Sequence, residues 1–424
     1  MDTKPGDRVL VDTADKQFEG IIMPSPIKTS IVVKLDSGYN VGIPKKTVKS
    51  LKVLKKYKEP KSTVGKLTVS KHKKIITILH TGGTIASKVD YETGGVVAKY
   101  TPAELVNMFP ELVKISNIKS RLISNMFSED LRFGHYNIMA KEIQKEVKAG
   151  VDGVILTHGT DTMHYTAAAL SFILEDLPVP VILVGAQRSS DRGSSDAAMN
   201  LICASEFIVR SDFAEVGVCM HENADDEFCY ILPGLKSRKM HSSRRDAFKA
   251  INVTPFAKVD FVRRKVDWIR NDYRKREKRK LQLKLFKDVK VGLLKMRPNM
   301  FEEELKAYSK FDGLILEGSG LGHWPINVVD ELTTSHKKMY ETLKKLTMKI
   351  PVAMTSQTIF GRVNMNVYST GRELKAMGIL GDQLDMTSET AYIKLAWLLS
   401  NYPKKVREMY SRNVRRELND QITT

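Results

Sequence analysis

From residue 75 onward, short runs of β-branched and aliphatic residues alternate with longer segments of helical periodicity. Strands that alternate with helices in this way predict βαβ units joined into a mostly parallel sheet. The expected strands are 75–79, 151–157, 179–184 and 216–220, and the expected helices are 163–176 and 196–210. A second block of the same kind has strands at 289–294, 313–316 and 351–354 and helices at 326–347 and 388–401. The predicted fold class is therefore α/β.

The first 54 residues have a different pattern. Short β-type runs at 8–11, 20–22, 31–35 and 39–43 are separated by turn signals such as DSG (36–38). This spacing predicts a small β-barrel domain over residues 1–54. Residues 55–74 are rich in lysine and contain a proline and a glycine, which is typical of a linker. The two α/β domains then cover residues 75–288 and 289–424.

Positive charge is concentrated in two stretches of the chain, whose formal net charge is +19 over 424 residues. Residues 45–74 hold twelve lysines and one acid, a net charge of +11. Residues 263–290 hold thirteen Lys and Arg and four acids, a net charge of +9. Such stretches are either a solvated surface that keeps the chain soluble or a contact for RNA phosphates, and charge alone leaves both interpretations open.

Two further features limit the kind of protein. No run approaches 18 apolar residues, and the start of the chain, MDTKPGDRVL, lacks the apolar segment of a signal peptide. Three scattered cysteines, Cys203, Cys219 and Cys229, are too few for a disulfide framework or a cysteine-rich zinc site. We therefore expect a cytoplasmic protein that holds no metal and has no membrane contact.

Two of the predicted strands end in loops rich in glycine and threonine, HTGGTIA (80–86) and HGTDTM (158–163). Ligands bind where strands end in such sheets, and glycine lets backbone N–H groups approach a ligand closely. A glycine pair is also common in ordinary tight turns, and neither loop has the GxxxxGK[ST] pattern of a phosphate-binding loop. His158 and His164 are six residues apart, a spacing that does not put two zinc ligands on one helix face.

A carboxylate, a hydroxyl and a lysine are candidates for proton transfer. Asp161 directly follows Thr160, and Lys239 lies in SRKMHSS (237–243), after a turn-like Pro-Gly pair. A lysine near a carboxylate can deprotonate a hydroxyl if burial lowers the pKa of its amine. The sequence alone does not place Lys239 near Thr160, and without further information Lys239 is one lysine among many.

The two loop motifs, in this order and about 75 residues apart, resemble the signature motifs of the bacterial-type L-asparaginase/glutaminase family. Further segments are similar to the D-type subunit family of archaeal glutamyl-tRNA(Gln) amidotransferases. They are GYNV (38–41), LEGSGLGHWP (316–325), MTSQTIFGRV (354–363), NVYSTGR (366–372) and AYIKLAW (391–397). Plain asparaginases lack the N-terminal domain, so the D-type subunit family is the better match. The resemblance implies two asparaginase-like α/β domains with mostly parallel sheets, preceded by the small β-barrel domain.

The resemblance also implies catalytic roles. Thr84 corresponds to the threonine of the first loop, and Thr160, Asp161 and Lys239 correspond to the second threonine with its supporting Asp and Lys. We expect Thr84 to attack the amide carbon of the substrate while the other three residues relay the proton. The motif does not decide which threonine attacks, so Thr160 activated by Lys239 is the rival nucleophile.

Substrate-binding roles follow in the same way. Ser128 and Glu129, in FSED (127–130), correspond to residues that grip the α-amino and carboxylate ends of the substrate. Tyr91 lies where a mobile loop supplies a tyrosine in the family. No residue corresponds to a metal ligand.

The implied reaction is hydrolysis of glutamine to glutamate and ammonia. A partner, the E-type subunit of the same amidotransferase, would use the ammonia with ATP and Mg²⁺ to convert Glu-tRNA(Gln) to Gln-tRNA(Gln), so no cofactor is expected in this chain. The resemblance also implies a homodimer core within a heterotetramer. A free-standing L-asparaginase with an accessory β-barrel remains an alternative. A catalytically silent RNA-binding scaffold is a second alternative, but the intact catalytic residues argue against it.

Overall fold

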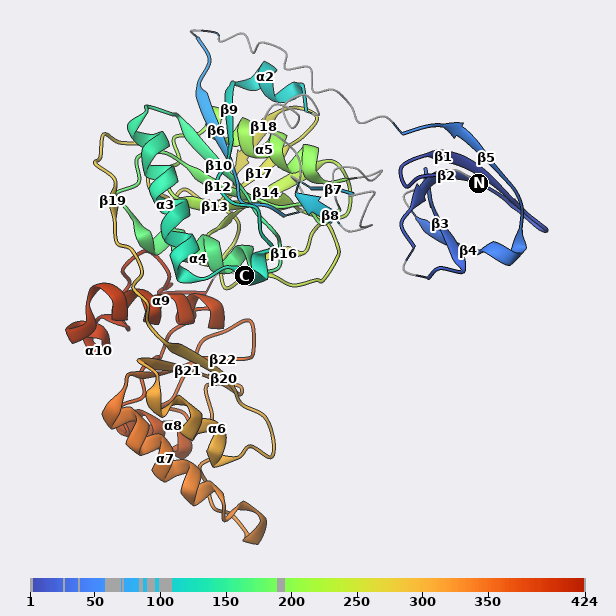
Figure 1. Cartoon of the computed structure of the whole chain (residues 1–424). Helices are drawn as coiled ribbons and strands as arrows, with labels where there is room; N and C mark the ends of the chain where they lie inside the picture. The colour runs from blue at the N-terminus through green and yellow to red at the C-terminus, as the bar shows by residue number, and fades with distance from the viewer. Residues whose placement is uncertain are drawn as a thin grey trace.

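The computed structural model describes residues 3–25, 27–36, 39–57, 70, 72–83, 87–89, 96–98, 109–188 and 195–422. The described elements form an antiparallel sheet near the N-terminus, a large central sheet and a smaller sheet in the last third of the chain (Figure 1). An all-β segment followed by two α/β segments is the predicted order of fold classes.

The N-terminal sheet consists of antiparallel strands in the order β4-β3-β2-β1-β5. They are β1 Arg8–Thr13, β2 Gln17–Met23, β3 Ser30–Leu35, β4 Asn40–Pro44 and β5 Val48–Lys55. A small hydrophobic core packs against the sheet, formed by Val9, Val11, Ile22, Val33 and Ile43. The sequence predicts the first four strands and misses β5, because lysines interrupt its apolar residues.

The central sheet has eight strands in the order β18-β17-β14-β13-β12-β10-β6-β9. Its parallel part comprises β9 Asn117–Leu122, β6 Ile75–His80, β10 Gly153–Thr157, β12 Val181–Val184 and β13 Val216–His221. Its antiparallel part comprises β14 Phe228–Pro233, β17 Ala257–Asp260 and β18 Lys265–Trp268. Every residue of β10, β12 and β13 is buried, as expected for parallel strands covered on both faces.

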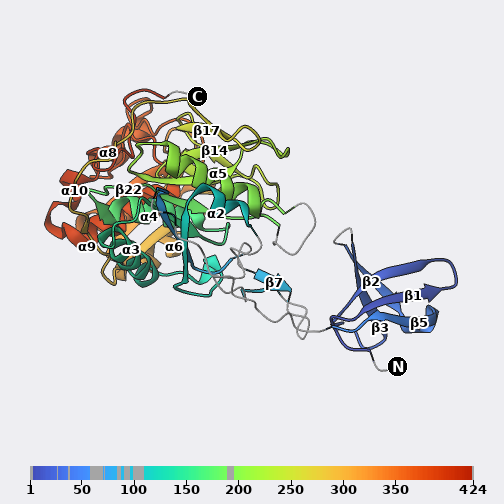
Figure 2. The same cartoon turned by 90° about the horizontal axis from the view of Figure 1, so that it is seen from above.

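Helices cover both faces of this sheet (Figure 2). One hydrophobic core includes α3 Phe133–Lys148 and α4 Met163–Ile173, and another includes α2 Glu111–Ile115 and α5 Ala197–Arg210. Val154 and Leu156 of β10 belong to the first core and Ile155 to the second, so the cores lie on opposite faces. The predicted alternation of strands and helices in this region is confirmed.

The C-terminal sheet has parallel strands β20 Val291–Lys295, β21 Gly313–Gly318 and β22 Val352–Ser356. Its helices are α6 Glu302–Lys306, α7 His336–Lys349, α8 Ser369–Ala376, α9 Ser388–Asn401 and α10 Val406–Met409. The helix predicted at 326–347 is wrong in its first ten residues. There the Asp330 side chain caps a short 3-10 turn by accepting from the backbone N–H of Thr333, and α7 begins only at His336.

Short two-stranded ribbons are separate from these sheets. They are β7 Ser87–Val89 with β8 Val96–Ala98, β11 Leu174–Glu175 with β19 Gln282–Leu283, and β15 Ser237–Lys239 with β16 Phe248–Ala250. Within the described ranges, none of the helices combines the length and the apolar character needed to cross a membrane.

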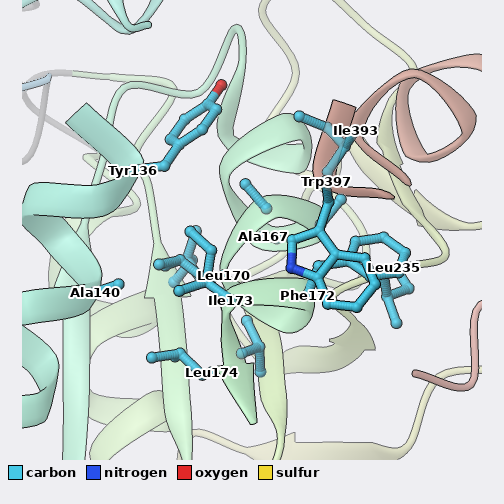
Figure 3. Close-up of a cluster of buried hydrophobic side chains, with 14 of the residues drawn as sticks. Tyr136, Ala140, Ala167, Leu170, Phe172, Ile173, Leu174, Leu235, Ile393 and Trp397 are labelled. Carbon is cyan, nitrogen blue, oxygen red and sulfur yellow. The ribbon is translucent and has the colours of Figure 1, made fainter. Parts of the chain in front are cut away.

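Helix α9 joins the C-terminal sheet to the central one. Its side chains are buried around nearly the whole helix and share a core with α3 and α4. The ring of Trp397 lies 5.3 Å from that of Phe172 in α4, and its indole N–H donates to the carbonyl oxygen of Lys284 (3.0 Å). Figure 3 shows Trp397 and Ile393 projecting from α9 toward α4. The two α/β segments therefore meet through a shared hydrophobic core.

Replacing Trp397 by alanine should lower the free energy of unfolding by about 3–5 kcal/mol, because a buried aromatic side chain leaves a cavity. Trp397 is completely buried, whereas Leu332 is 91% exposed, so Leu332→Ala is the control and should change stability by less than about 0.5 kcal/mol. Urea denaturation followed by circular dichroism measures both values. A Trp397→Ala variant as stable as the control would contradict the packing of α9.

Candidate active site

The two Gly- and Thr-rich loops leave the central sheet side by side. β6 and β10 are parallel neighbours, and His80 at the end of β6 is paired with Thr157 at the end of β10. The next residue, Thr81, donates to the carbonyl oxygen of Thr157 through its backbone N–H (3.2 Å) and its hydroxyl (2.9 Å). The loops are therefore held together at the carboxyl edge of the sheet, where ligands bind in such folds.

Gly83 lies where the two loops touch. It has a φ of +79°, and a Cβ at this position would lie 2.5 Å from the backbone nitrogen of Gly159. Gly82 has a φ of +109°, and a Cβ there would lie 2.5 Å from the carbonyl oxygen of Met126. Any side chain would strain the backbone and push these segments apart. Gly83 therefore allows the close approach of the two loops, and Gly82 allows the close approach of the first loop to the segment of Met126, beyond the needs of an ordinary turn.

Lys239 lies against the second loop. Its Nζ donates to the hydroxyl of Thr160 (2.8 Å) and to Oδ1 of Asp161 (2.8 Å). Thr160 is buried and the Lys239 side chain is 9% exposed, whereas that of Asp161 is 69% exposed. Gly185 makes room for Thr160, because a Cβ there would lie 2.6 Å from the threonine methyl carbon. The structure thus brings together the hydroxyl, carboxylate and lysine that the sequence alone does not connect.

This arrangement is suited to proton transfer. A lysine amine and a threonine hydroxyl joined by a hydrogen bond can pass a proton between them, and a neighbouring carboxylate orients the amine. Lys239 reaches the loop because it is the last residue of β15, where it pairs with Phe248 of β16. The ribbon places the side chain, so the contact depends on a segment distant in sequence from Thr160.

Ser128 and Glu129 also lie beside the second loop, in a 3-10 turn over Ser128–Asp130. The hydroxyl of Thr162 donates to the carbonyl oxygen of Ser128 (2.6 Å), and the hydroxyl of Ser128 lies 3.4 Å from Oε2 of Glu129. Ser128, Glu129 and Thr162 line a cleft of about 900 Å³. Thr162 is not among the site residues predicted from the sequence. Its place in the same loop as Thr160 was the available signal.

Thr84 and Tyr91, which the sequence assigns to catalysis and to a loop contribution, lie outside the described residues. Of the other site residues predicted from the sequence, Thr160, Asp161 and Lys239 are in mutual contact. Ser128 accepts a hydrogen bond from Thr162 of the same loop, and Glu129 follows Ser128 in the 3-10 turn.

Three histidines near the loops are buried. The ring of His158 donates from Nδ1 to the carbonyl oxygen of Gly159 (2.6 Å) and accepts at Nε2 from the hydroxyl of Thr166 (2.8 Å). Burial lowers the pKa of His80, His158 and His164 to about 4, so all three are neutral at pH 7. Within the described ranges, no three His, Cys, Asp or Glu side chains are grouped to hold a metal ion. These histidines support the loops by hydrogen bonding and packing.

The basic stretch at 263–290 makes many internal contacts. The guanidinium of Arg276 donates to the carbonyl oxygens of Asp152, Ile208 and Ser211. Other cations of the stretch pair with acids, as in Lys265–Asp267, Arg270–Asp272, Lys275–Asp212 and Arg279–Glu277. Arg276 therefore has a structural role, whereas the pairs with Asp267, Asp272 and Glu277 are already included in the net charge of +9 and leave both interpretations of the stretch open.

The buried histidines make stability depend on pH. In the unfolded chain a histidine has a pKa near 6.5, so each of the three takes up a proton on unfolding between about pH 6.5 and 4. Their stabilising contribution is therefore complete above about pH 6.5 and is lost as the pH falls toward 4. The expected slope is up to about 1.4 kcal/mol per pH unit for each histidine.

Urea unfolding at a series of pH values measures this slope. His158→Gln should reduce the slope by the contribution of one proton, about 1.4 kcal/mol per pH unit. His72→Gln is the control, because His72 is exposed. An unfolding free energy that does not change between pH 6.5 and 4.5 would contradict the neutral, buried state of these rings.

Comparison with known proteins agrees with this geometry. The family model "Asparaginase, N-terminal" matches residues 75–274, "Glutaminase/Asparaginase C-terminal domain" matches 290–410, and "GatD N-terminal domain" matches 3–54. Among solved structures, the thermostable L-asparaginase from Thermococcus kodakarensis superimposes with a TM-score of 0.71 at 27% identity. That match covers 82% of this chain and 100% of the other. An L-asparaginase I from Vibrio cholerae gives a TM-score of 0.70, also at 27% identity, covering 82% of this chain and 99% of the other.

Curated relatives match nearly the full length. The D-type subunit of glutamyl-tRNA(Gln) amidotransferase from Methanococcus maripaludis is 43% identical, with 98% of each chain covered. The protein of the same name from Pyrococcus furiosus is 44% identical, covering 93% of this chain and 89% of the relative. Identity at this level over both the N-terminal sheet and the two asparaginase-type parts shows that the chain belongs to the D-type subunit family of glutamyl-tRNA(Gln) amidotransferases.

Proposed function

We propose that this chain is the glutaminase subunit of a glutamyl-tRNA(Gln) amidotransferase and hydrolyses glutamine to glutamate and ammonia. The partner subunit uses the ammonia with ATP to convert Glu-tRNA(Gln) to Gln-tRNA(Gln). The observation that carries the proposal is the contact of Lys239 with Thr160 and Asp161 of the second loop, which leaves the sheet beside the first loop. Relatives named as the D-type subunit match the chain over its whole fold, which supports the same assignment.

The reaction proceeds in two acyl-transfer steps, because an amide is a poor electrophile and a covalent intermediate divides its hydrolysis. The hydroxyl oxygen of Thr84 bonds to the side-chain amide carbon of glutamine, and its proton passes through Thr160 to Lys239. That proton goes to the leaving nitrogen, which departs as ammonia. Water then attacks the ester carbon and passes its proton to the relay of Thr160 and Lys239, the bond to the Thr84 oxygen breaks, that oxygen takes the proton back, and glutamate is released.

The surrounding groups lower both barriers. Asp161 orients the amine of Lys239 from 2.8 Å. Backbone N–H groups of the glycine-rich loops stabilise the oxyanion, an effect of about 3–4 kcal/mol per donor. Ser128 and Glu129, beside the cleft, grip the carboxylate and the α-amino group of glutamine, since a hydroxyl donates to the first and a carboxylate pairs with the second. Tyr91 contributes from its loop.

The chain acts within a complex. Its partner is the E-type amidotransferase subunit, which holds the ATP and Mg²⁺ and presents Glu-tRNA(Gln), while this chain uses neither metal nor cofactor. A homodimer of this chain forms the centre of a cytoplasmic heterotetramer. The relatives' designation as one lettered subunit of an amidotransferase supports an assembly of several subunits.

A free-standing L-asparaginase is the second candidate function, favoured by the superposition on L-asparaginases. Those structures leave part of this chain without a counterpart, because they cover 82% of it. Residues 3–54 match the GatD N-terminal domain. A separate N-terminal domain has no purpose in plain amide hydrolysis, so the amidotransferase function is preferred.

Ammonia release from glutamine and from asparagine tests the choice. The full-length chain is assayed alone and then with its E-type partner, ATP and Glu-tRNA(Gln). We expect strong stimulation with glutamine, because free ammonia is wasteful and hydrolysis should be coupled to its use. Lys239→Ala should reduce the release to background, whereas Lys310→Ala, at an exposed position, should not. Full activity of the chain alone, with a preference for asparagine, would identify a free asparaginase instead.

A further inference from the structure

We propose that Glu389, in the first turn of α9, is a positioning residue for this reaction. By holding Arg238 it fixes the strand that carries Lys239 against the loop of Thr160. The inference rests on the proposed function, since it concerns the geometry of the same proton relay. It assigns a role to a residue of the C-terminal segment that has no contact with the reacting groups.

Lys239 needs support beyond its two hydrogen-bond partners. Asp161 is 69% exposed, and solvent weakens an ion pair of that kind to about 1 kcal/mol or less. The ribbon of β15 and β16 pairs only residues 237–239 with 248–250, and a two-stranded ribbon of this length is marginal in water. The position of Lys239 therefore depends on what holds β15 from its other side.

Two successive residues before Lys239 form contacts with the first turn of α9 and with the residues that lead into it. The carbonyl oxygen of Leu235 accepts from the hydroxyl of Thr390 (2.9 Å). Lys236 forms a buried ion pair with Asp385 (2.8 Å), and its ammonium also donates to the Asp385 carbonyl oxygen (3.0 Å). These two contacts fix the approach to β15 but not the strand itself.

Arg238 supplies the contact within the strand. Its Nε lies 3.0 Å from Oε1 of Glu389, and the Glu389 side chain is only 8% exposed. Successive side chains of a strand point to opposite faces, so Arg238 faces α9 while Lys239 faces the loop of Thr160. Fixing Arg238 therefore fixes the direction in which Lys239 projects, one peptide unit away.

Glu389 also touches the other half of the relay. Its Oε1 lies 3.8 Å from Nε2 of His164, in the first turn of α4, directly after the loop of Thr160 and Asp161. Burial and the nearby charges of Arg238 and Lys239 lower the pKa of His164 to about 4, so its ring is neutral at pH 7. The charge of Glu389 is then balanced by Arg238, and one carboxylate contacts both segments that carry the relay.

The test compares Glu389→Ala and Glu389→Gln with wild type in the full-length chain, assayed with its partner subunit and glutamine. Displacement of a catalytic group by about 1 Å costs up to roughly 100-fold in rate, so we expect Glu389→Ala to lower kcat by roughly 10- to 100-fold. KM should change by less than about two-fold, because the substrate-binding groups lie elsewhere. Glu389→Gln retains an acceptor for Arg238 and should recover part of kcat.

The matched control is Glu175→Ala. Glu175 forms a comparable, partly buried ion pair with Arg415 (2.6 Å), but it lies in β11 beyond the far end of α4. We expect the unfolding temperature of Glu175→Ala to fall as much as that of Glu389→Ala, whereas the kcat of Glu175→Ala should remain unchanged. In a double-mutant cycle, the kcat losses of Arg238→Ala and Glu389→Ala should be strongly non-additive.

Equal kcat in Glu389→Ala and Glu175→Ala would overturn the inference, as would a rise in KM at unchanged kcat. If Glu389→Ala does not fold, the kcat and KM of the isosteric Glu389→Gln are compared with those of Glu175→Gln, and the same two results would overturn the inference. Failure of the proposed function has a different signature, namely no glutamine-dependent ammonia release by wild type and no effect of Lys239→Ala. An active wild type with an inactive Lys239→Ala and fully active Glu389 variants would reject only the positioning role.

Discussion

The parallel pairing of β6 with β10 is the contact on which the candidate site depends, because it sets where two glycine-rich loops leave the sheet. The register places His80 opposite Thr157, and Thr81 adds two hydrogen bonds to the carbonyl oxygen of Thr157. A shift by one residue would turn every side chain of the strand to the other face and separate the loops. In this register Gly83 lies so close to Gly159 that a Cβ on Gly83 would be 2.5 Å from the backbone nitrogen of Gly159.

A second constraint comes from charges buried around α9. Lys236 pairs with Asp385 and Lys394 pairs with Glu417, and all four side chains are at most 2% exposed. Such pairs add little net stability, but separating the partners leaves a buried charge that costs about 3–5 kcal/mol. We infer that they select one arrangement of the C-terminal segment against the central sheet. That arrangement brings the start of α9 to the strand of Lys239.

Much of the fold is predictable from the sequence, because the local periodicity of apolar residues indicates where strands and helices lie. Buried parallel strands appear as apolar runs, and β6, β10 and β12 were found in this way. Several elements, among them α3, β9 and β14, are not predicted from the sequence, and two of the errors have local reasons. In β5 lysines separate the apolar residues, so the alternation that marks a strand is obscured. Before α7 an aspartate cap favours a 3-10 turn over the longer helix that the apolar pattern indicates.

The site was less predictable, because its central contact is not local. Thr160 and Lys239 are 79 residues apart in the chain, and nothing in the periodicity of either segment indicates their contact. Only the resemblance to a known family identifies Lys239 as a candidate catalytic residue. Arg238 and Glu389 carried no sequence signal at all, since an ion pair between two ordinary surface-type residues becomes visible only when the segments are packed together.

Thr84 is the proposed nucleophile, and Thr160, Asp161 and Lys239 are the proposed proton relay. The covalent intermediate can test this division of roles directly. A slow glutamine analogue would trap the acyl-enzyme, and peptide mapping by mass spectrometry would locate the modified residue. The assignment predicts an ester on Thr84 that fails to accumulate in Lys239→Ala. An ester on Thr160 would contradict it, because the residue in contact with Lys239 would then be the nucleophile itself.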